Sequence, residues 1–295
     1  MTHIRFFLSL MWAALALALA PPAMAQDADA VKRGEYVFHA AGCAGCHTDT
    51  QNKGALAAGG HALKTPFGTY YGPNITADKT HGIGNWSDAD FIRALREGKS
   101  PAGDHYFPVF PYPSFTKMTD QDMRDLKAYI FSLPAVATPN KPHEINFPFG
   151  FRFSMIFWKI LFFDEGAYRA DPAQNAEWNR GAYLSNALSH CGECHTPRNF
   201  MGALKGDMNM AGTPDGPDNA SVPNITPDPD TGIGKWSHQA IMDVLDGGMM
   251  PDGDFVGGAM TEVSENLAKI SKKDRKAIAV YIKSLPPIRN KVTKK

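Results

Sequence analysis

The sequence has no excess of charge of either sign, and it has only four cysteines. Its 295 residues include 30 Lys and Arg against 30 Asp and Glu, so no global charge would draw the protein to nucleic acid. No Ser-His-Asp order, paired-carboxylate motif or phosphate-binding loop stands out beyond chance. Glycine and proline are abundant, with 27 and 22 residues, which indicates a loop-rich protein with short helices.

Beyond the first 25 residues the chain lacks an uninterrupted apolar run of the roughly 20 residues that cross a membrane. The N-terminal stretch has the pattern of an export signal, with Arg5, an apolar run, and Ala23 and Ala25 in an A-x-A cleavage pattern. A membrane anchor is the alternative, but the run is short for a span. We therefore expect cleavage near Ala25 and a periplasmic protein of about 270 residues, enough for two domains. Losing Arg5 leaves 29 basic and 30 acidic residues.

All four cysteines lie in two Cys-x-x-Cys-His motifs, Cys43–His47 and Cys191–His195. A thioredoxin-type disulfide would need a βαβ context and does not need the histidine. A structural zinc ion would need four ligands in one place, whereas the pairs lie 148 residues apart (191 − 43). The remaining interpretation is the attachment of two haem c groups, in which thiols bond to the haem and the histidine ligates the iron. The predicted residues are Cys43, Cys46, His47, Cys191, Cys194 and His195.

The two halves of the chain repeat one another at an offset of 150 residues, as Asn74 and Asn224 illustrate. Each half should contain a helix with Gly-x-Tyr, the cysteine motif, a long loop, a short helix and a last helix. The offset is far too long for a solenoid repeat. It predicts a mostly α fold of two tandem haem domains. The expected organisation is a signal peptide at 1–25, a first domain at 26–140, an apolar linker at 141–172 and a second domain at 173–290.

Local signals mark several helices of both copies. Ser87 and Ser237 are expected N-caps of the short helices, and the last helices should begin at the capping patterns TDQD and SKKD. Glycine is costly inside a helix, but Gly34 and Gly181 would be tolerated where another helix approaches closely. We expect that partner to be the last helix of the same copy, near Tyr129 or Tyr281.

The chain resembles class I c-type cytochromes, and more closely the multi-haem cytochrome c subunits of periplasmic alcohol, aldehyde and sugar dehydrogenases. The resemblance is carried by CAGCHT, TPFGTYYGPNIT, GIGNWSDADF, WNRGAYL and HCGECHTPRN, and it covers nearly all of the chain after the signal. Such relatives often hold three haems, so this chain is more similar to the two-haem members. The resemblance implies an electron carrier, not a catalyst, between a periplasmic dehydrogenase and a downstream cytochrome or oxidase.

The same resemblance implies a methionine sixth ligand in the loop before the last helix. Met260 fills this position in the second domain, and a thioether opposite His195 would raise the haem potential. The matching residue of the first domain is Phe110, which cannot bind iron. His105, in the same loop, is a tentative replacement, while Met118 is more typical of core packing.

An open or water-bound first iron is the third alternative, and the three have different consequences. Ligation by two histidines would lower the potential of the first haem and direct electrons towards the second. An open iron would instead suit a haem enzyme, such as a peroxidase or a sulfur-compound dehydrogenase. The sequence leaves this choice open.

The segment INFPFGFRFSMIFWKILFFDEG, from Ile145, is the most apolar part of the chain after the signal. Arg152, Lys159 and the prolines interrupt it, so we do not expect it to span a membrane. The favoured interpretation is a linker helix buried between the two haem domains. A partner-docking surface and a membrane-surface helix are the alternatives, and exposure of the segment would mark an interaction site.

Overall fold

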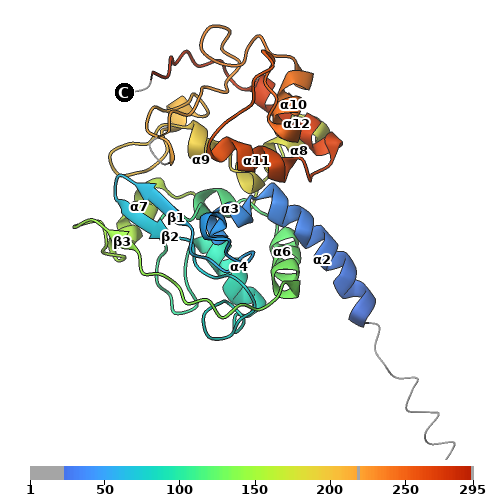
Figure 1. Cartoon of the computed structure of the whole chain (residues 1–295). Coiled ribbons are helices and arrows are strands. Elements are labelled where there is room, and N and C mark those ends of the chain that lie inside the picture. Colours follow the sequence, from blue (N-terminus) through green and yellow to red (C-terminus); the bar gives the residue numbers. More distant parts are fainter. Residues whose placement is uncertain (1–22, 218–219, 294–295) are drawn as a thin grey trace, which may run out of the picture.

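The computed structural model describes residues 23–217 and 220–293, and they form the mostly helical fold that the sequence predicts (Figure 1). The predicted signal peptide therefore lies almost wholly outside the described residues. The helices of the first half are α2 (Ala23–Ala40), α3 (Cys43–His47), α4 (Asp88–Glu97), α5 (Tyr112–Phe115) and α6 (Asp120–Ser132). Those of the second half are α8 (Ala176–Tyr183), α9 (Gly192–His195), α10 (His238–Gly247), α11 (Ala259–Leu267) and α12 (Lys272–Ser284). The repeated order is consistent with two tandem domains, and α7 (Ser154–Phe162) lies between them in sequence.

The helix starts match the capping residues that the sequence indicates. Ser87 and Ser237 cap α4 and α10 by accepting hydrogen bonds from backbone N–H groups in the first turn. Thr119 and Ser271 cap α6 and α12 in the same way. These caps satisfy N–H groups that a helix cannot pair internally, so the predicted starts are confirmed.

The first and last helices of each half cross at a glycine, as predicted. A Cβ atom added to Gly34 of α2 would lie 1.8 Å from the carbonyl oxygen of Asp125 and 2.8 Å from Cβ of Tyr129, both in α6. One added to Gly181 of α8 would lie 1.9 Å from the carbonyl oxygen of Ala277 in α12. Only glycine lets the two backbones approach this closely.

A small antiparallel sheet was not predicted. Strand β1 (Ala62–Thr65) pairs with β2 (Gly68–Tyr71), and β3 (Glu144–Ile145) adds to the other edge of β2. Pro66 and Phe67 form the turn between β1 and β2. Strands of two to four residues in a Gly- and Pro-rich loop carry too little alternation to be recognised from sequence.

One hydrophobic core runs through both halves. It joins Phe38 of α2 and Ile130 of α6 to Leu184 and to Ile278 of α12, all of which are at most 1% exposed. Leu184 opens a short π-helical turn, η2 (Leu184–Leu188), that continues α8. Single-turn 3₁₀ segments are η1 (Thr50–Asn52) and η3 (Gly206–Met208). The shared core holds the two halves together as a single unit.

The prediction that the linker helix is buried between the two domains is wrong. Helix α7 lies at the side of the first half, beside the sheet (Figure 1). Trp158 is 5% exposed, but Phe157, Ile160 and Leu161 are 62%, 75% and 63% exposed. The physical reason is that the first and last helices already fill the space between the halves. Within the described ranges, no helix is long and apolar enough to cross a membrane.

Candidate haem-binding sites

Both motif histidines donate a hydrogen bond from Nδ1 to a backbone carbonyl, as metal-ligating histidines usually do. The Nδ1 atom of His47 lies 2.7 Å from the carbonyl oxygen of Pro73, and that of His195 lies 2.8 Å from the carbonyl oxygen of Pro223. A proline carbonyl can only accept, so the proton is on Nδ1 and the lone pair on Nε2. This is the arrangement of a metal-ligating histidine, whose ring is oriented by its other nitrogen.

Burial keeps the motif side chains uncharged. It lowers the pKa of His47 and His195, and the hydrogen bonds to the proline carbonyls offset only part of this effect. Burial also raises the pKa of Cys43 and Cys191 to about 12. None of the four cysteines forms a disulfide. Each motif places its two cysteines and its histidine within one short helix or, for Cys191, at the N-cap of that helix. The donor set therefore fits a covalently attached haem with an axial histidine.

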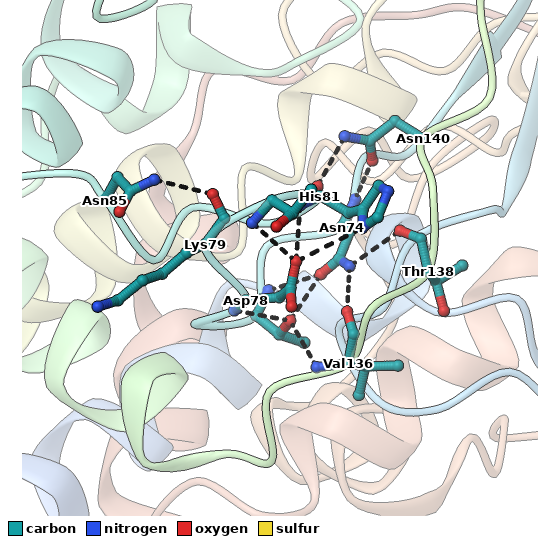
Figure 2. Close-up of polar contacts among 10 residues, drawn as sticks. Asn74, Asp78, Lys79, His81, Asn85, Val136, Thr138 and Asn140 are labelled. Carbon is teal, nitrogen blue, oxygen red and sulfur yellow. Dashed lines mark hydrogen bonds and ion pairs between the residues drawn. The ribbon is translucent and has the colours of Figure 1, made fainter.

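The carbonyl that orients His47 is held in place by the residue after it. The side-chain amide of Asn74 donates to the carbonyl oxygens of Val136 and Thr138, at 2.7 and 3.1 Å (Figure 2). The backbone N–H of Asn74 donates to Oδ1 of Asn140 at 2.7 Å. The segment that follows α6 thus holds the loop of Pro73 and Asn74 against His47 through these hydrogen bonds.

The second half repeats this hydrogen-bond arrangement. The side-chain amide of Asn224 donates to the carbonyl oxygen of Ile288 at 2.7 Å, in the segment that follows α12. Its Oδ1 accepts from the backbone N–H and the hydroxyl of Thr226, at 2.9 and 2.7 Å. Asn74 and Asn224 are 1% and 3% exposed, so both N-I-T sequences are structural loop elements.

Backbone hydrogen bonds place Phe110 and Met260 at equivalent positions. Tyr106 N–H donates to the Gly98 carbonyl at 2.8 Å, and Val256 N–H donates to the Gly248 carbonyl at 2.9 Å. These pairs differ by 150 residues (256 − 106), as do Phe110 and Met260. Met260 lies in the first turn of α11, partly buried against the shared core. Phe110 is also partly buried, among aromatic side chains of the first half.

His105, the tentative ligand of the first haem, has neighbours on the linker side. Arg152 donates to its carbonyl oxygen at 3.0 Å. Its Nδ1 is buried and has no hydrogen-bond partner among the described residues. Burial lowers the pKa of His105, and the positive charges of Lys159 and Lys99 lower it further. Met118 is fully buried in the shared core, which agrees with its expected role in packing.

Each motif helix faces the other half of the molecule. Glu193 in α9 accepts a hydrogen bond from the Ser114 hydroxyl of α5 at 2.8 Å. Conversely, a Cβ atom on Gly45 in α3 would lie 3.1 Å from Glu262 Oε1 of α11. Although the two motifs are thus near the same interface, no group of three or more His, Cys, Asp or Glu side chains in the described ranges is placed to share a metal ion.

Two tyrosines lock the halves together reciprocally, which sequence reasoning missed. The Tyr36 hydroxyl of α2 donates to Asp274 and accepts from Ser271 N–H at 3.3 Å, at the start of α12. The Tyr183 hydroxyl of α8 donates to Asp122 and accepts from Thr119 N–H at 3.1 Å. The sequence signal was that each copy has a tyrosine in its Gly-x-Tyr segment and an acid three residues after the N-cap of its last helix.

The contact between Tyr36 and Asp274 also includes a cation, Arg180. Arg180 donates to both carboxylate oxygens of Asp274, at 3.0 and 2.6 Å. Burial alone would raise the pKa of Asp274, but the hydrogen bonds from Arg180 and Tyr36 outweigh it and hold the pKa below its usual value. Asp274 is therefore charged at neutral pH and accepts from both halves of the molecule.

Replacing Tyr36 or Tyr183 by phenylalanine should lower the free energy of unfolding by about 1.5–3 kcal/mol, because each change removes a hydrogen bond to a partly buried carboxylate. Urea unfolding followed by circular dichroism measures the change. Tyr71→Phe is a matched control, because the Tyr71 hydroxyl donates to Glu144 within one half at an exposed site. An equal loss in Tyr71→Phe and Tyr36→Phe would contradict the interdomain role.

The two motif helices, with their carbonyl-anchored imidazoles and paired cysteines, are characteristic of a c-type cytochrome. The family model for Cytochrome c matches residues 31–134. The diheme cytochrome c-type of Cereibacter sphaeroides is 41% identical over 259 residues, which cover 87% of this chain and 86% of that protein. The chain therefore belongs to the cytochrome c family.

Two further relatives are cytochrome subunits of dehydrogenases. The fructose dehydrogenase cytochrome subunit of Gluconobacter japonicus is 40% identical over 258 residues, covering 87% of this chain and 52% of that subunit. The alcohol dehydrogenase (quinone) cytochrome c subunit of Gluconobacter oxydans is 38% identical over 277 residues, covering 90% and 57%. This chain thus spans a little over half the length of these two subunits.

Proposed function

We propose that this protein is a periplasmic dihaem c-type cytochrome that accepts electrons from a dehydrogenase and passes them to a downstream cytochrome or oxidase. The observation that carries the proposal is the pair of Cys-x-x-Cys-His helices, each with its histidine Nδ1 bound to a proline carbonyl. The relatives that are cytochrome subunits of dehydrogenases support the dehydrogenase as electron donor. In this proposal the signal peptide is cleaved near Ala25, and haem domains at 26–140 and 173–290 are joined by the linker at 141–172.

The residues of the chain would hold, orient and insulate the two haems. Thioether bonds would form at Cys43 and Cys46 in the first domain and at Cys191 and Cys194 in the second. A bound haem supplies a one-electron iron couple, and the proposed iron ligands are His47 in the first domain and His195 with Met260 in the second. Anchored imidazoles and the shared apolar core favour electron transfer with little rearrangement of the protein.

The first haem differs from the second because Phe110 stands where Met260 does. His105 is the ligand proposed for this haem. Ligation by two histidines would place the first haem at a lower potential than the His195–Met260 haem. Electrons would then enter at the first haem and leave from the second.

Low-temperature electron paramagnetic resonance of the oxidised protein tests the His105 proposal. It predicts two low-spin haem signals in the parent protein and the loss of one of them in His105→Ala. Phe110→Met serves as the companion variant. A high-spin signal in the parent that becomes low-spin in Phe110→Met would show an open first iron instead, and would favour the haem-enzyme alternative.

Substrate-driven reduction tests the electron-carrier function. The oxidised holo-protein is mixed with a periplasmic extract of its source organism, and an alcohol or fructose is added while the haem absorption bands are followed. Reduction that depends on both extract and substrate is expected. Oxidation of a small substrate, or rapid turnover of peroxide, by the purified protein alone would contradict the proposed role.

A further inference from the structure

The linker carries a large exposed apolar surface, which we call the linker patch. Its members are Phe147, Phe149, Phe151, Phe153, Ile156, Phe157, Ile160, Leu161 and Phe162. Their exposed fractions range from 36% to 85%, so together they present on the order of 1,000 Å² of mostly apolar surface, since one aromatic side chain contributes about 150–250 Å² when fully exposed. The largest apolar patch of an ordinary monomer is about 300–600 Å². The linker patch is therefore too large to be incidental.

The patch is held in a defined shape. The Trp158 indole N–H donates to the Met201 carbonyl at 3.0 Å, which fixes the inner face of α7. The Phe147 and Phe151 rings are in edge contact, with centroids 6.1 Å apart, and Phe151 contacts Phe153 at 5.9 Å. A surface that is already ordered loses little conformational entropy when a partner binds.

Both cations of the patch segment point inward. The Arg152 guanidinium lies 5.0 Å from the centre of the Phe107 ring and donates to a backbone carbonyl. The Lys159 ammonium donates to the carbonyl oxygens of Glu97 and Gly98, the latter at 2.9 Å. Neither cation is therefore presented to a partner from the exposed face of the patch.

This charge distribution favours a protein partner over a lipid surface. A helix that lies on a membrane presents lysines and arginines beside its apolar face, where they meet anionic headgroups. Here the first exposed charged residues that follow α7, ahead of Arg169, are the acids Asp164 and Glu165, which such headgroups would repel. Aromatic enrichment and loss of charge are instead typical of the centre of a protein–protein interface.

The patch lies next to the loop that follows the second haem-attachment motif. Met201, which accepts the Trp158 hydrogen bond, belongs to this loop, and so does Phe200, which is 89% exposed. Arg198 ties the same loop to the motif helix through Glu193, at 2.6 Å. Arg152 also connects the patch segment to the His105 loop of the first domain, at 3.0 Å, so a protein docked on the patch would sit beside the haem at which electrons are proposed to enter.

We propose that the linker patch is the docking surface for the dehydrogenase subunit that reduces this cytochrome. The inference rests on the proposed function, and it identifies the face through which that function operates. The patch matches the roughly 800 Å² that each partner contributes to a standard interface. Because the contact is apolar, its strength should depend little on salt, unlike an encounter steered by surface charge.

The test uses the holo-protein and the dehydrogenase purified by its ability to reduce it. In the double variant Phe157→Ser/Ile160→Ser, the KM of the dehydrogenase for the cytochrome should rise about tenfold or more, because two central contacts are lost. The kcat and the haem spectrum should stay unchanged. Phe255→Ser is the matched control, because Phe255 is 67% exposed in the second half, outside the patch, and its KM should equal that of the parent.

Several results would overturn the inference. One is an unchanged KM in the double variant. Another is that the parent binds phosphatidylglycerol vesicles and the double variant does not, while KM is unchanged. A third is that the parent is a dimer in sedimentation equilibrium and the double variant is not, while KM is again unchanged. If no dehydrogenase reduces even the parent protein, the proposed function itself fails, so the two failures are distinguishable.

Discussion

Gly34→Ala is expected to destabilise the protein by at least about 3 kcal/mol. The new methyl group would lie 1.8 Å from the Asp125 carbonyl oxygen, far inside van der Waals contact. No side chain can turn away to relieve the clash, because the obstructing atom is backbone. Helices α2 and α6 must therefore move apart and open the shared core. Thermal unfolding of the holo-protein and its haem content measure the effect.

Gly181→Ala should behave in the same way, since its Cβ would lie 1.9 Å from the Ala277 carbonyl oxygen. Gly247, in α10, is the control: no atom outside its immediate chain neighbours lies within 4 Å of its Cβ position. Alanine there should stabilise the helix by up to about 1 kcal/mol. Equal stability of the Gly34 and Gly247 variants would show that the close helix crossing does not exist in solution.

Met260→Ala is expected to remove the proposed sixth ligand of the second haem. The low-spin signal of that haem should become high-spin, and its reduction potential should fall by on the order of 100 mV, because the soft thioether favours reduced iron. The signal of the first haem should not change. Electron paramagnetic resonance and a spectroscopic redox titration give both quantities.

Met250→Ala controls for the loss of a methionine near the same loop, and it should leave both signals as in the parent. Met250 follows directly on α10 and its N–H donates to the Asp254 carbonyl at 2.7 Å. If the second haem stays low-spin in Met260→Ala, or loses its low-spin signal in Met250→Ala, then Met260 is not its sixth ligand.

What the sequence predicted correctly depends on local chemistry or on the duplication. Helix starts follow from a capping residue, which at α4, α6 and α12 is followed within one turn by an acid three positions later. The contact at Gly34 could be predicted because glycine is costly in a helix unless something requires it, and the second copy repeats it at Gly181. The histidine–carbonyl bonds follow from the chemistry of metal ligation, although nothing in the sequence identified Pro73 and Pro223 as the acceptors.

What the sequence did not predict depends on contacts between distant segments. Tyr36 meets Asp274 across 238 residues. Both copies repeat the tyrosine and the acid, but nothing local pairs the tyrosine of one half with the acid of the other. The exposure of α7 was mispredicted because an apolar helix is ordinarily buried. Whether it is buried depends on how much room the two halves leave, and the shared core leaves none. The orientation of His105 likewise depends on α7, whose position was unknown from sequence.

We propose that one chain carries two covalently attached haems and that both exchange electrons. A reductive titration of the purified holo-protein, with haem quantified as the pyridine haemochrome under denaturing conditions, tests this most directly. Because each motif would hold one haem, we expect two haems and two electron equivalents per chain, with both haems reduced by the dehydrogenase and its substrate. One haem per chain, or a second haem that the dehydrogenase cannot reduce, would contradict it.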